Sequence, residues 1–425
     1  MEVQTWLAID LSASSSDQTT GSEMQSTSTI SQETNSFTSP ETNSSPSNLS
    51  HKTLKPSISH LCIATLKTLT PQISCLAVHN HALYAASINQ INVFDLTNHA
   101  LIDTFSSDDP RSGVVKSIAF GNGKIFTAHQ DCKIRVWRIS PSKRHRLMST
   151  LPTVKDRLYR CISPMNYVQV RRHVKRLWIE HVDAISGLVI NDGLIYSASW
   201  DKSFKVWKMS DQRCLESIKA HDDAVNAVAV SGDSLVYTAS ADGKIRVWER
   251  GDGERRGMHV LITTLEKHKS SVNALALNGD GSALFSGGGD RLILVWEREE
   301  GDDHNHMMVA WSLSGHGGAV LCLMCVDDVL VSGSSDRTVR VWQRGTDGGF
   351  CCVTVLEGHV KPVKSLVAVS GGSVSTGGGR VSTGGGGVMV YSGSLDGEVK
   401  VWQVMVSDVS SESPASYNLR LTRDV

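Results

Sequence analysis

Hydrophobic and polar residues alternate in short runs along most of the chain, and these runs recur in a fixed frame. Three segments align without a gap, at residues 197–207, 238–248 and 332–342. Each has a short apolar or β-branched run, an Asp among small or polar residues, and an alternating run that ends in Trp. This pattern predicts a strand, a tight turn and a second strand.

The same frame recurs at residues 127–137, 286–296 and 392–402, and a weaker copy ends at Phe94. Another apolar run precedes most copies, as at residues 225–230, and a short strand such as 214–218 precedes that. The aromatic ends lie about 41 to 48 residues apart where no insertion intervenes, which is typical of the blades of a propeller. We therefore predict an all-β fold, a seven-bladed β-propeller.

Residues of about 60 to 404 resemble the WD-repeat family, on the strength of these repeated Asp and Trp positions. The resemblance implies that a strand from the N-terminal end completes the last blade. Residues 61–66, Leu-Cys-Ile-Ala-Thr-Leu, lie where that closing strand is expected. Such closure would remove an open sheet edge that otherwise invites aggregation.

The chain divides into a central propeller and two tails. Residues 1–57 are rich in Ser, Thr, Asn, Gln and Glu, so they bury too little apolar surface to offset ordering, and we expect a disordered tail. Residues 58–406 form the expected propeller, which has a basic insertion at 140–176 and a Gly-rich insertion at 371–387. Residues 407–425 are a C-terminal tail.

Five repeats carry the same set of polar residues: a His that precedes the block, a Ser or Thr, the turn Asp and the final Trp. The members are His181, Ser197, Asp201 and Trp207; His221, Thr238, Asp242 and Trp248; His268, Ser286, Asp290 and Trp296; His316, Ser332, Asp336 and Trp342; and His359, Ser392, Asp396 and Trp402.

A Ser, a His and an Asp together suggest a hydrolase, but one active site needs one such set, and this chain repeats it five times. We interpret the set as a structural network in which Asp accepts from His and from backbone N–H groups, His donates to the hydroxyl, and the indole N–H joins them. No catalytic residue, cofactor or metal ligand is therefore predicted. Cys322 and Cys325 would point to opposite faces of a strand, which disfavours a shared metal.

The first two repeats depart from the set. In the first, an ungapped frame puts Leu69, Tyr84, Ile88 and Phe94 at the four positions, so apolar packing replaces the network. In the second, Thr127, Asp131 and Trp137 remain and Arg111 takes the place of His, where its guanidinium could serve the carboxylate.

Function in a propeller resides mainly in its loops. The loops that lead into the blades and the central turns share one end of the ring, which we call the top face. Candidate partner-binding residues there are Arg111, Gln130, Asp183, Trp200, Asp223, Lys361 and Leu395. Trp200 either anchors a partner or lies flat over its own blade.

The opposite, bottom face carries the insertions. Between Ser140 and Trp178 there are ten Lys or Arg and one Asp, and the candidate contacts are Lys143, Arg144, Arg146, Arg171, Arg172, Lys175 and Arg176. This patch could meet an acidic or phosphorylated partner, or a nuclear import receptor, or be a solvated strand. The Gly-rich insertion lacks a phosphate-loop motif, and His304 and His306 fit an exposed loop better than a metal site.

Residues 151–158 and 166–186 resemble the plant JINGUBANG family of WD-repeat proteins, in which a basic insertion follows the second blade. The resemblance implies a plant regulatory protein that acts through protein contacts. The leading hypothesis is thus a non-catalytic scaffold or adaptor in signalling or transcriptional control. A ubiquitin-ligase substrate receptor and a nucleic-acid binder that uses the basic insertion are the alternatives, although Arg follows Trp248, Trp296 and Trp342 one place earlier than in such receptors.

Composition bears on location more than on partners. A net charge of −1 gives no general attraction to nucleic acid or membrane. Nine scattered cysteines suit reduced thiols, and neither a leader nor a membrane-spanning run is recognisable. We expect a monomeric propeller in the cytoplasm, the nucleus or both, with other proteins as partners.

Overall fold

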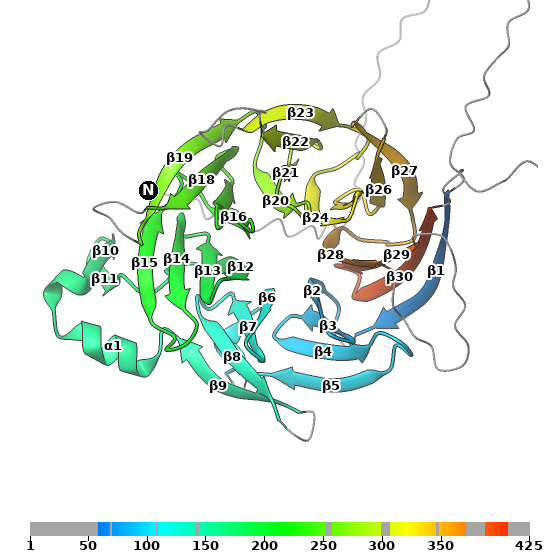
Figure 1. Cartoon of the computed structure of the whole chain (residues 1–425). Coiled ribbons are helices and arrows are strands. Elements are labelled where there is room, and N and C mark those ends of the chain that lie inside the picture. Colours follow the sequence, from blue (N-terminus) through cyan, green and yellow to red (C-terminus); the bar gives the residue numbers. More distant parts are fainter. Residues whose placement is uncertain are drawn as a thin grey trace, which may run out of the picture. The chain divides into compact units, whose positions relative to one another are not determined.

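The computed structural model describes residues 58–68, 70–107, 109–140, 144–251, 257–298, 307–345, 348–370 and 387–406. Within them, seven antiparallel sheets of four strands each stand around a common centre (Figure 1). The expected tails, the Gly-rich segment 371–386, and Leu69, Lys143, His304 and His306 lie outside the described residues.

The first three blades are built from consecutive strands. Blade 1 comprises β2 (Ile73–His79), β3 (Ala82–Ser87), β4 (Gln90–Asp95) and β5 (Leu101–Ser106); blade 2 comprises β6 (Val115–Gly121), β7 (Lys124–His129), β8 (Ile134–Ile139) and β9 (His145–Leu151); blade 3 comprises β12 (Ile185–Asn191), β13 (Leu194–Ser199), β14 (Ser203–Lys208) and β15 (Cys214–Lys219).

The next three blades follow the same order. Blade 4 comprises β16 (Val225–Val230), β17 (Val236–Ser240), β18 (Lys244–Arg250) and β19 (His259–Glu266); blade 5 comprises β20 (Val272–Leu277), β21 (Ala283–Gly288), β22 (Ile293–Arg298) and β23 (Met307–Leu313); blade 6 comprises β24 (Val320–Val326), β25 (Val329–Ser334), β26 (Val339–Arg344) and β27 (Phe350–Leu356).

The seventh blade joins the two ends of the described chain. It comprises β28 (Val363–Ser370), β29 (Gly387–Ser394), β30 (Glu398–Val406) and, as its outermost strand, β1 (Ile58–Lys67). β1 pairs with β30 over its whole length, so the predicted closing strand is present and extends past residues 61–66. The inner strand of each blade contacts the inner strands of its neighbours, β28 and β2 included, which closes the ring.

An insertion lies between blades 2 and 3, on the outside of the ring (Figure 1). It contains helix α1 (Val154–Cys161), a short 3-10 helix η2 (Pro164–Asn166), and a hairpin of β10 (Tyr167–Arg171) and β11 (Val174–Leu177). A second 3-10 helix, η1 (Pro110–Ser112), leads into blade 2. No helix among the described residues is long and apolar enough to cross a membrane.

Each inner strand carries a β-bulge directly after its first residue. A bulge re-aims one side chain away from the sheet. In four blades that side chain donates to the first inner carbonyl of the next blade, at 2.6–3.0 Å: Ser74 to Val115, Ser186 to Val225, Asn226 to Val272, and Asn273 to Val320. The bulges therefore link neighbouring blades near the centre of the ring.

Two blade pairs carry an additional contact between a His and a carboxylate at their outer strands. His145 of blade 2 lies 2.7 Å from the carboxylate of Asp103 in blade 1. The same arrangement joins His259 of blade 4 to Glu216 of blade 3, at 3.2 Å. Both histidines pack on aromatic rings of the preceding blade, including Phe105 and Phe204. These pairs hold blades 1 and 2, and blades 3 and 4, together away from the centre.

The repeated polar residues come together within blades 3 to 7. In each, His Nδ1 lies 2.8–2.9 Å from the turn Asp, His Nε2 lies 2.7–2.8 Å from the Ser or Thr hydroxyl, and the indole N–H donates to that hydroxyl at 2.8–3.0 Å. The second carboxylate oxygen accepts a backbone N–H from the central turn, as Asp201 does from Ser203. The carboxylate thus ties the leading loop to the turn.

Proton positions within the network differ from the sequence-based expectation. Burial lowers the pKa of His181, His221 and His359, so these rings are neutral at pH 7. Nδ1 faces a carboxylate and must carry the single ring proton, so Nε2 accepts from the hydroxyl. The expected direction of donation, from His to the hydroxyl, is therefore reversed.

The carboxylate remains ionised despite its burial. Burial would raise the pKa of Asp201, but the pairing with His181 and the hydrogen bonds from Ser203 and the Val182 N–H lower it further than burial raises it. The pKa of Asp201 consequently lies well below its ordinary value. A buried carboxylate with this many donors is stabilised in its charged form.

Blade 2 satisfies its turn carboxylate and its buried hydroxyl with different residues. His129 lies 2.8 Å from the Thr127 hydroxyl, which also accepts from the Trp137 indole at 2.9 Å. Asp131 accepts two hydrogen bonds from Arg135, at 3.0 and 2.8 Å. Arg111 is exposed in η1, and the expectation that its guanidinium serves the carboxylate is wrong. Arg135 on the adjacent strand is closer and performs that role.

Blade 1 has a shorter central turn than the sequence frame assumed. Ser87 pairs directly with Gln90, so only two residues form the turn, and Ile88 has a φ of 53°. This moves the position equivalent to Ser197 from Tyr84 to Ala85, which pairs with Asn92. The ungapped assignment of Tyr84 was wrong because the one-residue deletion shifts the register. The four-residue network is still replaced, by a small side chain and apolar packing around Phe94.

All nine cysteines are free thiols. Burial raises the pKa of Cys322 and of Cys325 to about 12, which suppresses the reactive thiolate. The Cys322 thiol contacts the Val363 carbonyl of the next blade, whereas that of Cys325 contacts the Asp327 carbonyl. The two thiols thus have separate surroundings.

We expect Asp242→Ala to lower the free energy of unfolding by about 2 to 4 kcal/mol, because His221 and two backbone N–H groups lose their acceptor. Chemical denaturation measures the change. Asp328→Ala removes an exposed turn carboxylate and is the matched control, with a shift below about 0.5 kcal/mol. Equal midpoints for the two variants would contradict a stabilising network.

Stability should fall with acidity partly through His129. Burial, followed by the charges of Arg135 and Lys133, lowers its pKa to about 3. The unfolded chain binds this proton below about pH 6.5 and the folded chain does not, so folding loses about 1.4 kcal/mol per pH unit between about pH 6.5 and 3 from this side chain. We expect His129→Gln to flatten the pH dependence of unfolding across that range. A wild-type slope in His129→Gln would refute the assignment.

Candidate functional site

The top face is formed where each central turn meets the loop that leads into its own blade. The backbone N–H of the turn residue donates to the loop at 2.8–3.0 Å in six blades, as from Trp200 to Ala184 and from Leu395 to Pro362. Because neighbouring inner strands also contact each other, these six loop–turn pairs share one end of the ring. The structure therefore brings the predicted top-face residues to a common face.

Most of these residues are open to solvent. Arg111, Gln130, Asp183, Asp223 and Lys361 are exposed. The Gln130 side chain accepts from the Val114 N–H at 3.3 Å, and the Asp183 carboxylate accepts from the Ala184 N–H at 2.7 Å. Such contacts shape the loops and leave the remaining polar atoms available to a partner.

Trp200 does not lie over its own blade alone. The ammonium of Lys116, on inner strand β6 of the preceding blade, lies 4.8 Å from the centre of the indole ring. An ammonium over an indole face is a cation–π contact. Trp200 is half-buried, so one part of the ring is held by Lys116 and another remains accessible. This contact links blades 2 and 3 at the top face.

Sequence reasoning missed Lys116 and a second lysine, Lys364. Both are the bulged residues of their inner strands, where four other blades carry Ser or Asn. Burial lowers the pKa of Lys116, and the charge of Lys364 lowers it further, so the two ammonium groups influence each other. The signal was available in the repeat alignment, because these two positions are basic where four other repeats carry Ser or Asn and one carries Leu321.

The basic insertion residues form two groups in place of the single expected patch. The first group, Arg144 and Arg146, lies at the start of β9. The second group lies on the β10–β11 hairpin, which follows β9 and α1 in the chain, and comprises Arg172, Lys175 and Arg176. A strand of this length spans about 20 Å, and Figure 1 places the hairpin and the start of β9 in different regions of the rim. Arg171 begins the hairpin turn, and its side chain is not described.

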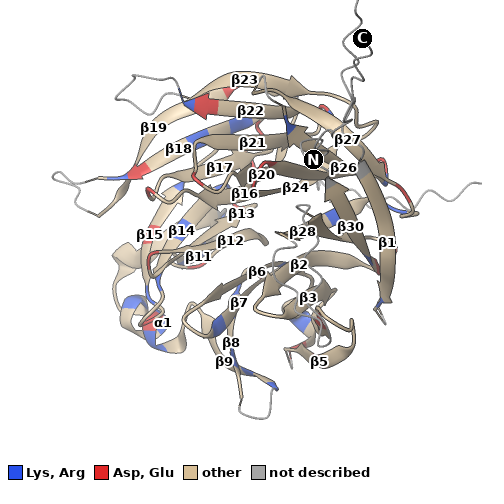
Figure 2. Cartoon of the chain, turned by 45° about the vertical axis from the view of Figure 1, so that its right-hand side comes forward, with Lys and Arg blue, Asp and Glu red and all other residues tan. Residues whose placement is uncertain are grey.

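Acidic neighbours offset part of the positive charge of the insertion. Glu180 lies 3.0 Å from Arg157 and 3.8 Å from Arg176, and Asp156 lies 2.9 Å from Arg160. Basic residues are nonetheless visible on α1, at the outer rim of the ring (Figure 2).

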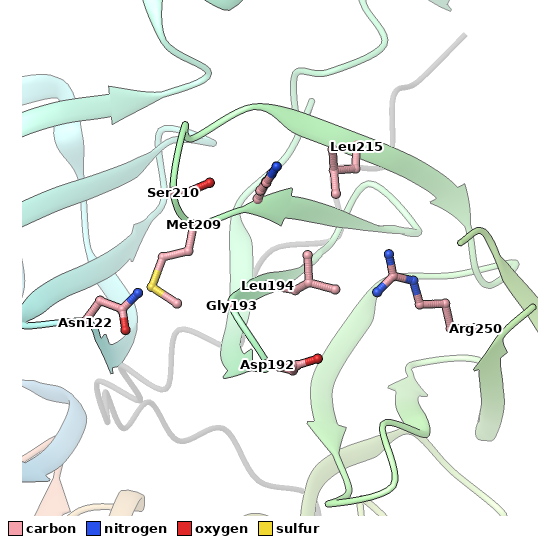
Figure 3. A pocket seen from close by; sticks show the side chains of 9 residues that line it. Asn122, Asp192, Gly193, Leu194, Met209, Ser210, Leu215 and Arg250 are labelled. Atoms are coloured by element: carbon pink, nitrogen blue, oxygen red, sulfur yellow. The ribbon is translucent and has the colours of Figure 1, made fainter. Parts of the chain in front are cut away.

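One pocket opens near the turns of blades 2 to 4 (Figure 3). It has a volume of about 400 Å³, and its lining includes Asn122, Asp192, Met209, Ser210 and Arg250. Ser210 lies among the lining residues together with Lys208 and Asp192, and no His lines this pocket. In the part of the chain that the structure describes, no group of three or more His, Cys, Asp or Glu could hold a metal ion.

The family model described as WD domain, G-beta repeat, matches residues 212–249, 259–297, 308–343 and 350–403. These segments run through blades 4 to 7 and begin at the end of blade 3. The matches agree with the four-stranded blades and with the Asp and Trp positions described above.

Curated relatives match over parts of their length. A probable cytosolic iron-sulfur protein assembly protein 1 of Chaetomium globosum is 33% identical over 116 residues, 22% of this chain and 26% of the relative. Cell division control protein 4 of Saccharomyces cerevisiae is 36% identical over 107 residues, 24% of this chain and 12% of the relative. Zinc finger CCCH domain-containing protein 62 of Arabidopsis thaliana is 25% identical over 169 residues, 39% of this chain and 38% of the relative.

The aligned segments thus cover less than two fifths of each of these three relatives. They do not show the JINGUBANG family, which stays an expectation from the insertion sequence. Together, the matched repeats and the closed ring of seven sheets show that this chain carries WD40 repeats in a seven-bladed β-propeller.

Proposed function

We propose that this protein is a non-catalytic interaction scaffold or adaptor whose partners bind the top face. The contact between Trp200 and Lys116 is the observation that carries the proposal. It presents an aromatic ring and a positive charge between two blades, and aromatic residues dominate the energetics of many protein interfaces. Propellers with WD40 repeats generally act as interaction scaffolds, which agrees with this role.

The internal networks support the same function. In blades 3 to 7 the Ser or Thr, His and Asp side chains bond to one another within the blade, and the hydroxyls and imidazoles are buried or nearly so. A hydrolase would need an accessible nucleophile next to an oxyanion site. The repeated set stabilises a rigid ring, and the exposed loops are left to recognise partners.

We assign the scaffold to plant regulatory signalling or transcriptional control, in the cytoplasm, the nucleus or both. This assignment rests on the resemblance of residues 151–158 and 166–186 to the JINGUBANG family. Direct nucleic-acid binding is less well supported, because the basic residues form two groups and Glu180 and Asp156 pair with several basic side chains of the insertion.

Proximity labelling in plant cells tests the top face. We expect Trp200→Ala to reduce the recovery of bound proteins at least about tenfold, since removing an aromatic anchor costs about 2 kcal/mol or more. Trp311→Ala is the matched control, because Trp311 is an exposed indole on β23, an outer strand of blade 5.

Both variants should unfold at the wild-type temperature, which separates loss of binding from loss of fold. Recovery of the same proteins in the same amounts by the top-face variant would count against the proposal. If ubiquitin-ligase adaptors are recovered with the wild-type protein and are lost only with that variant, the scaffold is instead a substrate receptor.

A further inference from the structure

Helix α1 packs with its polar side inward. Asp156 is 3% exposed, and Arg160 of the same side is only partly exposed. Thr153 caps the helix by accepting from the Asp156 N–H at 3.1 Å. An isolated helix of eight residues is marginal in water, so contacts with the propeller must hold it in place.

Those contacts are hydrogen bonds to the backbone at a sheet edge. Asp156 accepts from the Cys214 N–H at 3.2 Å, and Arg160 donates to the Cys214 carbonyl at 3.1 Å. Cys214 begins β15, the outermost strand of blade 3. The Arg160 guanidinium also lies 4.4 Å from the centre of the Trp178 ring. Together these contacts fix the rotation of α1 about its axis.

This rotation leaves the apolar side of α1 facing away from the propeller. Val154, Leu158 and Ile162 recur every four residues and are 73%, 62% and 83% exposed. Residues at this spacing lie along one face of a helix. Met165, just beyond, is 90% exposed. A surface helix normally buries its apolar face, so this unpartnered stripe is the reverse of the usual arrangement.

A pocket continues the apolar stripe at its N-terminal end. It has a volume of about 610 Å³, and its lining includes Val154 of the helix, Leu147 and Met148 of β9, the basic residues Lys133, Arg135 and Arg157, and one acidic residue, Asp109. Leu147 and Met148 are themselves about half exposed. A bulky apolar side chain of a partner could enter this pocket.

Three basic residues lie on the helix or on the hairpin that adjoins it. Lys155 lies on α1, and Arg172 and Lys175 lie on the hairpin, whose strand β11 contacts α1. All three are exposed, and none forms an ion pair with another described residue. A partner that covers the stripe would therefore meet uncompensated positive charge at its rim.

We propose that α1, the hairpin and the adjoining pocket form a docking surface for an acidic amphipathic helix of a partner protein. This inference rests on the proposed scaffold function and adds a second surface to it. An apolar stripe at four-residue spacing complements the apolar face of such a helix, and its Asp and Glu residues would face the basic rim.

Two other occupants fit less well. A second copy of this chain would place one basic rim against another, and like charges oppose that contact. An anionic bilayer would satisfy the basic rim and the apolar stripe, but it offers no discrete side chain to fill the concave pocket beside Val154.

The surface can be tested with a displayed library of helical peptides of about 18 residues. Peptides are selected for binding to the full-length chain, and those that also bind the Leu158→Asp variant are removed. The selected peptides should be acidic and carry apolar residues at helical spacing. Their affinity should fall at least about tenfold for Leu158→Asp and for Lys175→Glu, which is about 1.4 kcal/mol or more in binding. Absence of enrichment, or enrichment of peptides without net negative charge, would overturn the proposal.

Matched controls isolate the site. Leu61→Asp places the same charge at a leucine that is also 62% exposed, in blade 7, and Lys267→Glu reverses an exposed charge next to blade 5. Neither should change peptide affinity by more than about twofold, a difference of about 0.4 kcal/mol. Equal losses in these controls would show that the peptides bind by general charge, and would also refute the site.

Two further measurements address the other occupants. If the chain binds phosphatidylserine vesicles, Leu158→Asp abolishes that binding and no peptide is selected from the library, the surface is a membrane-binding one. Dimerisation in sedimentation that Leu158→Asp abolishes would identify a second copy, and either result would overturn the proposal. The Trp200 experiment is independent, because Trp200 lies on the top face and not in the insertion, so failure here leaves the scaffold function standing.

Discussion

The fold depends on one repeated interaction, the buried turn carboxylate that connects the two loops of a blade. In blade 3, Asp201 accepts from His181, from the backbone of the leading loop and from the backbone of its own turn. A buried charge is tolerated only when its acceptors are satisfied, so the carboxylate dictates the positions of several donors at once. The result is a rigid turn at the same end of each such blade, and these rigid turns form the top face.

The two divergent blades show what this constraint requires. Blade 2 keeps a charged carboxylate and therefore supplies Arg135 as a bidentate partner, while His129 reaches the Thr127 hydroxyl from within its own strand. Blade 1 shortens its turn and has no carboxylate in it, and Ala85 takes the hydroxyl position. Both solutions leave no buried charge unpaired. Each therefore costs less folding free energy than removing one residue of the network and leaving its partners buried.

The repeat frame predicted the blades because strand, turn and strand patterns depend on local sequence, whereas the closing strand was implied by the resemblance to WD-repeat proteins. The frame erred where register changed by one residue, as at Tyr84, and where a nearer cation replaced a predicted one, as Arg135 replaced Arg111. The repeat alignment marks Lys116 and Lys364 as unusual, but it does not show that each is the bulged residue of its inner strand. Helix α1 escaped prediction because hydrogen bonds to a distant strand determine its orientation, while its own apolar spacing suggests the opposite one.

The inverted helix has a cause in the architecture of the ring. The outer strand of each blade has an unpaired edge, and exposed edges invite unwanted strand pairing. At Cys214, the polar side of α1 covers that edge. Asp156 supplies an acceptor for the Cys214 N–H, and Arg160 supplies a donor for the Cys214 carbonyl. A helix that meets a sheet edge in this way must turn its apolar side outward. Edge protection and an exposed apolar stripe are thus two consequences of the same contacts, and a binding surface on the rim arises without any change to the propeller itself.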